Sequence, residues 1–402
     1  MSGSTVTSVV VSDQELRDRF RPVFERIAVG SVERERDRRL LFDEVRWLRE
    51  VRFGALRVPV EQGGFGASVR QLFDLLIDLG AAESNLPQAL RVHWVFVEDQ
   101  RLAADSRWLE AAAQGTLVGN AITEPGVGSA DRYRTVLRRV GEGWQLDGVK
   151  YYSTGSLYAD HILVAADRDG DRIAVLVDAD RDGVAQTDDW DGFGQRLTGS
   201  GTTTFTGVTV PDDRILGPGY GASGRTYSTA YLQLVQLAVL AGIAARAEVD
   251  VAEWVRARTR TFTHAAADLP RHDPLVQQVV GRISAAAFGA RAAVLAVADD
   301  LDALLDAGGE DPVLLDRAES NSARAQSVVI GLVLDATAEL FDVGGASITS
   351  SELGLDRHWR NARTVAAHNP LIYKQQAIGA HVLNDDPLPY AWSAGRRPEA
   401  VG

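Results

Sequence analysis

The sequence has no cysteine and only one methionine among its 402 residues. Without cysteine, the chain has no disulfide, no thiolate nucleophile, no zinc–thiolate site and no iron–sulfur cluster. We therefore predict no metal site.

Basic side chains are in deficit as well. The 42 Lys and Arg residues stand against 55 Asp and Glu residues, which gives a formal net charge of −13. This balance argues against nucleic acid or an anionic membrane as the partner.

Signals for export or membrane insertion are also lacking. The N-terminus shows no basic segment followed by a long apolar stretch, so no signal peptide is readable. The longest apolar stretch, around residues 234–245, contains Gln236 and is too short to span a bilayer. With 45% hydrophobic and 24% charged residues, the composition is that of a soluble globular protein, and we expect it in the cytoplasm.

Hydrophobic periodicity divides the chain into three zones. Residues 1–117 show the three-to-four-residue spacing of helices, with a glycine-rich interruption at 61–68 before a helix expected near Val69. Residues 118–222 alternate as strands do, and residues 223–402 return to helical spacing. We predict an α+β fold, mostly α, with an N-terminal helical domain, a middle β-domain and a C-terminal helical bundle.

The middle zone contains two hairpin signals, one around residues 141–143 and one around an Asp-Gly turn at 169–170, followed by the strand TTTFTGVTV. These short strands predict a small antiparallel barrel or sandwich. In the last zone, Asp273-Pro274 and Asp311-Pro312 each have the pattern of a cap followed by proline at the first helical position. We expect these helices to reach about Leu305 and Gly344, and a further one to cover about 225–260.

Four segments carry residues suited to chemistry, and each has an ordinary structural explanation beside the functional one. GNAITEPGVGSAD (119–131) is a strand and glycine loop that would either bind a ligand or simply turn the chain. KYYSTG (150–155) would flank a flat heterocycle or end a strand. FDVGGAS (341–347) is at least a glycine helix cap, and DRHWRNARTVAAHNPLIYK (356–374) holds arginines and histidines that suit either a ligand or surface ion pairs.

Taken in this order on an α–β–α plan, the four segments resemble the acyl-CoA dehydrogenase superfamily from about residue 15 to 385. That resemblance implies a four-helix C-terminal bundle, with a flavin between the bundle and the β-domain. It also exposes a departure, because a dehydrogenase needs a carboxylate base to remove the substrate proton. The positions where the family carries that base, residues 365–370 and the helix 226–247, contain no acid.

The combination of WRNART, HNP, YK and IG between residues 359 and 379 resembles instead the flavin monooxygenase branch typified by dibenzothiophene monooxygenase. This resemblance implies a two-component enzyme. It would take reduced flavin, FMN with FAD possible, from a separate NAD(P)H-dependent reductase, form a C4a-hydroperoxide with O2 and oxygenate a small substrate at S, N or C. We expect an aromatic substrate, because aromatic residues surround His93 without a charged clamp, and a homotetramer.

The resemblance also assigns residues. Catalytic roles fall on His368, Ser153, Asn120 and His93. Contacts with the cofactor fall on Asn120, Thr123, Glu124, Gly128, Ser129, Tyr152, Ser153, Arg258 or the nearby Arg260, Ala346, Ser347 and His368. Ala346 and Ser347 are expected to approach the flavin of a neighbouring subunit, and Trp94 and Phe96 to line the substrate pocket or pack in the core.

Two other functions stay open at this stage. One is an acyl-CoA dehydrogenase whose base lies elsewhere, which would bind FAD and oxidise acyl-CoA. The other is an oxygen-independent biosynthetic protein on the same fold, which would consume no O2 with reduced flavin and substrate.

Overall fold

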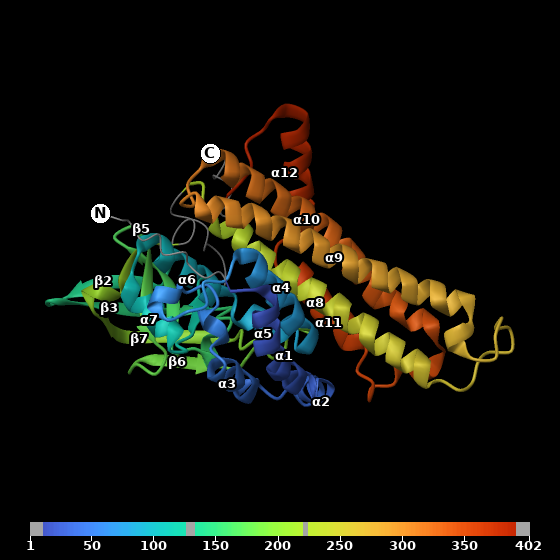
Figure 1. The fold of residues 1–402 in the computed structure, drawn as a ribbon. Helices are drawn as coiled ribbons and strands as arrows, with labels where there is room; N and C mark the ends of the chain where they lie inside the picture. The colour runs from blue at the N-terminus through green and yellow to red at the C-terminus, as the bar shows by residue number, and fades with distance from the viewer. Residues whose placement is uncertain (1–10, 126–132, 220–223, 391–402) are drawn as a thin grey trace, which may run out of the picture.

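The computed structural model describes residues 11–125, 133–219 and 224–390. Seven α-helices precede the sheet in these ranges: α1 Asp13–Ala28, α2 Ser31–Asp37, α3 Phe42–Glu50, α4 Val69–Ala82, α5 Asn85–Ala89, α6 Arg91–Ala103 and α7 Ser106–Ala113. Ser12 and Ser68 cap α1 and α4, each in a reciprocal capping box with the residue three positions on. As Figure 1 shows, these helices lie between the sheet and the long C-terminal helices.

The β-region forms one eight-stranded sheet in the order β6-β7-β3-β2-β4-β5-β8, with β1 paired to β4. Its strands are β1 Val118–Ala121, β2 Val136–Val140, β3 Gly143–Lys150, β4 His161–Arg168, β5 Asp171–Asp178, β6 Val184–Thr187, β7 Thr202–Val210 and β8 Ile215–Pro218. Both predicted hairpins are confirmed, since Val140 pairs with Gly143 and Arg168 pairs with Asp171.

The expectation of purely antiparallel pairing is wrong in this sheet. β1 and β2 both run parallel to β4. Neither pair is joined by a tight turn, and only antiparallel neighbours can be connected that way. The turn signals in the sequence therefore marked the hairpins and left the parallel pairs invisible. Residues such as Leu146, Val164 and Phe205 form a core of their own on the sheet.

The C-terminal region contains α8 Ser228–Ala257, α9 Pro274–Asp306, α10 Pro312–Glu339, α11 Asp356–Ala366 and α12 Leu371–Asn384. Asp273 and Asp311 cap α9 and α10 as predicted, each accepting hydrogen bonds from the first helical turn. The α-helical part of α10 ends at Glu339, and a 3-10 turn, Leu340–Val343, leads to the double glycine. α8 to α11 pack as the bundle, and α12 projects from it (Figure 1).

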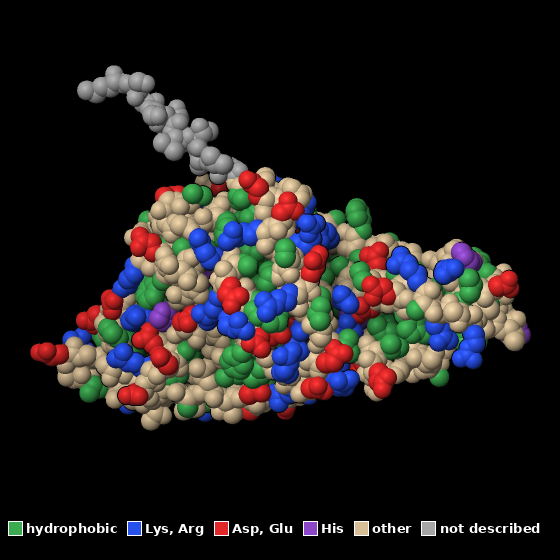
Figure 2. Space-filling model, turned by 60° about the horizontal axis from the view of Figure 1, so that its bottom comes forward, with side chains coloured by type: hydrophobic (Ala, Val, Ile, Leu, Met, Phe, Trp, Pro, Cys, Tyr) green, Lys and Arg blue, Asp and Glu red, His purple; other side chains and the backbone are tan. Residues whose placement is uncertain are grey.

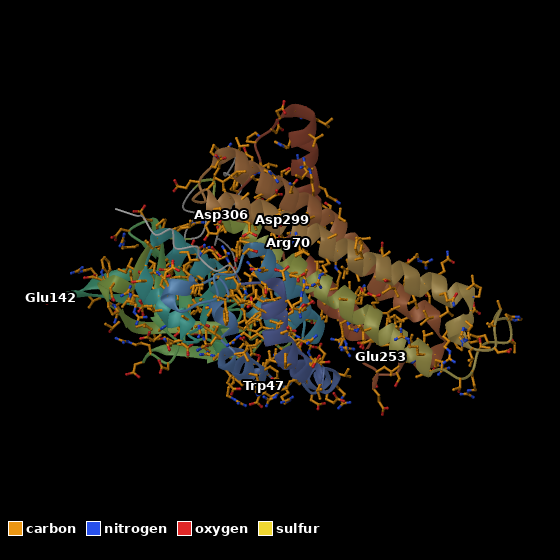
Figure 3. The ribbon with its side chains drawn as sticks, viewed as in Figure 1. Trp47, Arg70, Glu142, Glu253, Asp299 and Asp306 are labelled. Atoms are coloured by element: carbon orange, nitrogen blue, oxygen red, sulfur yellow. The ribbon has the colours of Figure 1, made fainter. Side chains whose placement is uncertain are left out.

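The first and third zones share one hydrophobic core, because α4 packs on α8 and α9. α4 and α8 cross so closely that a side chain on Gly242 would come within 2.6 Å of the Gly80 backbone. The carboxylate of Asp302 on α9 accepts hydrogen bonds from the Val69 and Arg70 backbone N–H groups, at 2.6 and 2.9 Å. The Arg70 side chain also pairs with Asp299 of α9 at 2.7 Å (Figure 3). Apolar packing and charge together thus fix the N-terminal helices to the bundle.

Among the described residues, α8 and α9 are long and apolar enough to satisfy the length and hydropathy of a membrane span. In α8, 89% of the most apolar window is buried inside the protein, so its hydropathy reflects a core position. The corresponding window of α9 is 33% buried. The face shown in Figure 2 carries acidic and basic side chains interspersed with apolar ones.

Candidate active site

A cavity of about 560 Å³ lies between the sheet and the C-terminal helices, a size common for small-molecule sites. Its β-region side is formed by Asn120, Ile122, Thr123, Tyr133, Tyr152, Thr154, Trp190, Gly192, Phe193, Gln195, Thr198 and Ser200. Its helical side is formed by Gln88, Arg91, Thr229, Leu232, Gln233, Arg363, Thr364, Val365, Ala367, His368, Asn369 and Lys374. Side chains from all three zones of the chain therefore meet here.

Asn120 sits on β1 with its side chain at the cavity. Its backbone N–H donates to the Thr154 carbonyl at 3.2 Å and its Nδ2 to the Tyr152 carbonyl at 3.3 Å. These bonds orient the amide, and its buried Oδ1 has no partner among the described residues. Tyr152 is 47% exposed, and its ring meets that of Trp190 edge-on at 5.5 Å between centroids. Two aromatic rings and an oriented amide thus stand on this wall.

Ser153 does not line the cavity. Its side chain is fully buried, its Oγ has no partner among the described residues, and its N–H donates to the Gly201 carbonyl at 2.9 Å. Thr154, the next residue, lines the cavity instead, with its hydroxyl 2.9 Å from that of Ser200. The chain turns here, since the Thr154 N–H donates to the Tyr152 carbonyl at 2.9 Å, and the hydroxyl at the cavity is that of Thr154.

Glu124 also faces away from the cavity. Its carboxylate accepts hydrogen bonds from the backbone N–H groups of Arg134 and Thr135, both at 2.8 Å, and pairs with the buried Lys150 at 3.0 Å. Burial opposes ionisation, but these partners keep the pKa of Glu124 below its ordinary value. Glu124 therefore fixes the chain ends that flank the glycine loop. Thr123 lines the cavity, and the predicted Gly128 and Ser129 lie outside the described residues.

His368 lies on the helical wall, in the turn between α11 and α12. Its Nε2 is 2.9 Å from a terminal nitrogen of Arg91, at the start of α6. A guanidinium only donates hydrogen bonds, so Nε2 must accept and the ring proton of neutral His368 resides on Nδ1. The ring faces the cavity on one side, and protein surrounds it on the others. This enclosure, and then the charge of Arg91, lower the pKa of His368 to about 3.

His93 is a core residue in this structure, not a cavity residue. It is fully buried, and its Nε2 lies 2.9 Å from the Gly54 carbonyl. Burial lowers its pKa to about 4. Trp94 and Phe96 are buried as well, and none of the three lines the cavity. The helix does reach the site, but through Arg91 at its first turn.

Arg258, Ala346 and Ser347 lie at the other end of the bundle. Arg258 follows α8, 25 positions after the cavity residue Gln233, which corresponds to roughly 37 Å of helix. It packs on the Trp254 ring, and the adjacent Gly344 also contacts Trp254. The structure thus brings the predicted Arg258 and 344–347 segment together, but away from the cavity of the same chain.

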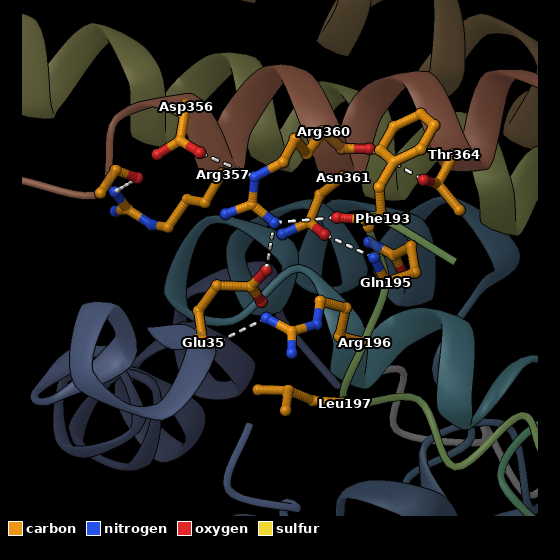
Figure 4. A network of polar contacts seen from close by, with 12 residues as sticks. Glu35, Phe193, Gln195, Arg196, Leu197, Asp356, Arg357, Arg360, Asn361 and Thr364 are labelled. Atoms are coloured by element: carbon orange, nitrogen blue, oxygen red, sulfur yellow. Dashed lines mark hydrogen bonds and ion pairs between the residues drawn. The ribbon is translucent and has the colours of Figure 1, made fainter. Parts of the chain in front are cut away.

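The first half of α11 holds the cavity wall in place through a polar network (Figure 4). Arg360 pairs with Asp356 at 2.8 Å and Glu35 at 3.0 Å, and donates to the Phe193 carbonyl at 2.9 Å. Asn361 accepts from the Gln195 N–H at 2.5 Å. These bonds fasten the 190–197 segment, which carries Trp190 and Gln195, to α11. This part of the WRNART motif is therefore structural.

Two buried clusters anchor the ends of this helical wall. His358 contacts Asp250 at 2.8 Å, and burial lowers the pKa of His358 to about 4. Just after His368, α12 is fixed to α10 by an ion pair between Lys374 and Glu319, both 2% exposed, at 2.8 Å. The ion pair between Lys374 and Glu319 therefore holds the turn that contains His368 in position.

The lining of the cavity suits a flavin ring, and it lacks the carboxylate base that oxidation of a thioester requires. No Asp or Glu is among its described lining residues, so the carboxylate base that sequence reasoning failed to find is not supplied by the fold there either. Buried polar atoms of Asn120, Gln195 and Gln88 at the cavity have no partner within the described ranges. Such atoms call for a ligand or water, and beside Tyr152 and Trp190 they suit a flat ring with hydrogen-bonding edges.

Sequence reasoning missed several of the cavity residues, among them Arg91, Trp190 and Gln195. Arg91 begins α6, and its link to the site is the contact with His368, 277 positions along the chain, which no local pattern indicates. Trp190 and Gln195 had no local signal either, because they belong to an irregular segment whose position depends on α11.

Comparison with known proteins agrees with this geometry. Residues 119–208 match the acyl-CoA dehydrogenase middle domain and residues 234–371 match the acyl-CoA dehydrogenase C-terminal domain. Dibenzothiophene monooxygenase from Mycolicibacterium goodii is 28% identical over 387 residues, covering 89% of this chain and 91% of the relative. The probable FMNH2-dependent monooxygenase SfnC from Pseudomonas putida is 26% identical, covering 86% of this chain and 89% of the relative.

Solved structures give the same result. FMN-bound TdsC from Paenibacillus sp. A11-2 superposes with a TM-score of 0.87 at 28% identity, over 94% of this chain and 99% of TdsC. Methanesulfinate monooxygenase MsuC from Pseudomonas fluorescens gives a TM-score of 0.85 at 26% identity, over 94% and 99% of the two chains.

The chain belongs to the acyl-CoA dehydrogenase family, and its fold is the one predicted for that family. Within the family its similarity is to the flavin-dependent monooxygenases, so the enzyme is an oxidoreductase of that branch, as the sequence predicted.

Proposed function

We propose that this protein binds reduced FMN, delivered by a separate NAD(P)H-dependent reductase, and oxygenates a small molecule with O2. The observation that carries the proposal is the cavity itself: unpaired amide groups and aromatic rings on one wall, His368 on the other, and no carboxylate among the described lining residues. Reduced flavin supplies the two electrons with which one oxygen atom enters the substrate and the other leaves as water.

The sheet wall would hold the flavin ring. Asn120, oriented by the carbonyls around it, offers its unpaired Oδ1, and Thr154 offers a hydroxyl where Ser153 was expected. Tyr152 and Trp190 provide aromatic contact and exclude water. Arg363, which follows the α11 residues bound to the 190–197 segment, provides positive charge for the phosphate.

His368 would manage the proton. With Nε2 occupied by Arg91, its proton is held on Nδ1 and the ring is neutral over the physiological range. A neutral ring donates a hydrogen bond to a reacting oxygen without adding a charge to the site. In this assignment His368 has the predicted catalytic role, and near pH 7 it acts as a neutral ring.

A homotetramer would explain the remaining predicted residues. Arg258, Ala346 and Ser347 cannot reach the cavity of their own chain, so any contact with flavin would come from another copy. The exposed apolar side chains of α9, including Phe288 at 77%, provide a surface for such an assembly.

The function is tested by two measurements on the same protein. FMN binding is followed by quenching of flavin fluorescence, for the wild type and for Asn120→Leu, with Asn120→Asp as the variant that keeps an acceptor oxygen. We expect the leucine variant to bind more weakly than the aspartate variant. Turnover is then measured with chemically reduced FMN, isotopically labelled O2 and indole or methanesulfinate.

One labelled oxygen atom in the product supports the proposal. If the protein binds flavin but incorporates no label and consumes no O2 beyond free reduced flavin, the monooxygenase function is wrong. Reduction of an artificial acceptor by acyl-CoA would then establish the dehydrogenase alternative.

A further inference from the structure

Three hydroxyl groups form a chain of hydrogen bonds on the sheet wall of the cavity. The Thr154 Oγ1 lies 2.9 Å from the Ser200 Oγ, which in turn lies 2.6 Å from the Thr198 Oγ1. All three residues line the cavity, and Ser200 and Thr198 are only 6% and 1% exposed. The last member, Thr198, donates to the Gln195 carbonyl at 2.9 Å. The chain therefore ends on a group that can only accept.

This terminal carbonyl sets the direction of every hydrogen bond in the chain. A hydroxyl has one proton to donate and two lone pairs with which to accept. Because Thr198 gives its proton to Gln195, Ser200 must donate to Thr198. The Ser200 proton is then engaged, so Thr154 must donate to Ser200. The Thr154 oxygen is left with a lone pair, and toward a ligand in the cavity it acts as a hydrogen-bond acceptor.

Backbone hydrogen bonds hold together the two turns that carry these hydroxyls. The Gly155 N–H donates to the Thr198 carbonyl at 3.0 Å. The Ser153 N–H donates to the Gly201 carbonyl at 2.9 Å. A hydroxyl proton can rotate, but this pairing of the turns sets the distances between the hydroxyl oxygens. The order of donors and acceptors is therefore built into the folded wall.

The same wall carries a second acceptor. The Asn120 Nδ2 donates to the Tyr152 carbonyl at 3.3 Å, and the Asn120 Oδ1 has no partner among the described residues. Both groups call for an N–H or O–H group on the ligand. An oxidised flavin ring has an N–H group at N3 and a bare nitrogen at N5, whereas the reduced ring also carries a hydrogen on N5. Reduction thus supplies the kind of group that this wall accepts.

We propose that Ser200 and Thr198 are positioning residues that keep Thr154 a hydrogen-bond acceptor, and that the wall thereby favours reduced over oxidised flavin. This inference rests on the proposed function, in which reduced flavin enters and oxidised flavin leaves. Where two lone pairs face each other, both polar groups stay without a bond. Such unmade bonds discriminate well between ligands that differ in one donor. A wall that holds the oxidised ring less tightly also releases it more readily.

The test compares the affinities of the protein for reduced and oxidised FMN under anaerobic conditions. We expect the wild type to bind reduced FMN about tenfold more tightly, as one hydrogen bond predicts. This preference raises the two-electron midpoint potential of the bound flavin above that of free FMN by about 30 mV.

Two variants should remove the preference, because each removes a group that fixes the direction of the chain. Ser200→Ala leaves the Thr154 proton without its acceptor, and Thr198→Val leaves the Ser200 proton without one. Each should bring the two affinities close to equal, while Thr198→Ser, which keeps the hydroxyl, should retain the wild-type ratio. If Ser200→Ala and Thr198→Val both keep that ratio, the proposal is wrong.

A modified cofactor separates this effect from packing. In 5-deaza-FMN a carbon replaces N5, so neither redox state offers an N–H group or a lone pair there. Ser200→Ala and Thr198→Val should leave the affinity ratio for this analogue unchanged, and an equal shift with FMN and 5-deaza-FMN would overturn the proposal. Ser156→Ala is the matched control, because this buried hydroxyl donates to the Ser153 carbonyl at 2.7 Å and is not part of the chain. It should keep the wild-type ratio.

The inference and the proposed function fail in different ways. A wild-type protein that binds both forms of FMN equally well and still oxygenates a substrate contradicts the inference alone. A protein that prefers reduced FMN but incorporates no oxygen into any substrate contradicts the proposed function. A protein that binds neither form of FMN contradicts both.

Discussion

In the core behind α6, His93 faces the Gly54 carbonyl, whereas at the cavity His368 faces the Arg91 guanidinium. The carbonyl requires a proton on Nε2 of His93, and the guanidinium requires a bare Nε2 on His368. Both rings are neutral near pH 7, because burial lowers the pKa of His93 to about 4 and enclosure with the charge of Arg91 lowers that of His368 to about 3. The partner atom sets the tautomer of each ring, and the position of the ring decides its use: His93 is fully buried in the core, whereas His368 lies at the cavity.

The largest difference between the two regions should appear in catalysis. His368→Ala should lower kcat by about 10²- to 10⁴-fold, the usual contribution of a positioned proton-handling group, while FMN affinity stays close to the wild type. His93→Gln should retain most of the activity, since its amide can still donate to Gly54. Steady-state oxygenation with both variants checks this, and normal turnover in His368→Ala would refute its role.

The next largest effect should be on the free energy of unfolding, when the buried ion pair that supports the cavity wall is broken. Lys374→Met leaves Glu319 charged and buried, and should lower the free energy of unfolding by about 3–5 kcal/mol. Adding Glu319→Leu should recover most of the loss, because an apolar pair needs no charge partner. Urea denaturation of the two variants and the wild type measures both values. A double variant as unstable as the single one would show that the ion pair does more than balance charge.

In the core region, the contribution of buried His93 to the free energy of unfolding should depend on pH. The folded pKa of His93 lies below the ordinary 6.5, so between pH 6.5 and 4 the unfolded chain binds a proton that the folded chain does not. Its contribution to stability is complete above pH 6.5 and is lost as the pH falls, by about 2 kcal/mol between pH 7 and pH 5. His93→Gln should lack this part of the acid sensitivity. Urea titrations at both pH values test it, and parallel losses in the two proteins would contradict it.

Much of the fold was predictable because its signals are local. A hairpin turn, an aspartate cap or a proline at the first helical position acts within a few residues, and Asp273 and Asp311 cap the helices they were expected to cap. The parallel partners of β4 gave no such signal, since their pairing depends on distant segments.

The site was predictable in outline and not in detail. His368, Asn120, Thr123 and Tyr152 do line the cavity. Ser153 and Thr154 are neighbours in the turn that follows β3, and only the three-dimensional path of the chain decides which hydroxyl faces the ligand. Glu124 looked available because the two backbone N–H groups that bind it come from the far side of a loop. Arg91 escaped attention because its meaning depends on a histidine 277 positions away.

The crossing of α4 and α8 at Gly80 and Gly242 bears on how a ligand enters. Backbone lies against backbone there, so tilting one helix on the other would separate a large apolar area at once. The 190–197 segment is held by hydrogen bonds instead: those with Arg360 and Asn361 of α11, one from Arg38 to the Trp190 carbonyl, and those of Leu197 with Asn85 and Tyr158. We expect this segment, and not the helical core, to move when a ligand enters, at a rate set by how readily these hydrogen bonds open together.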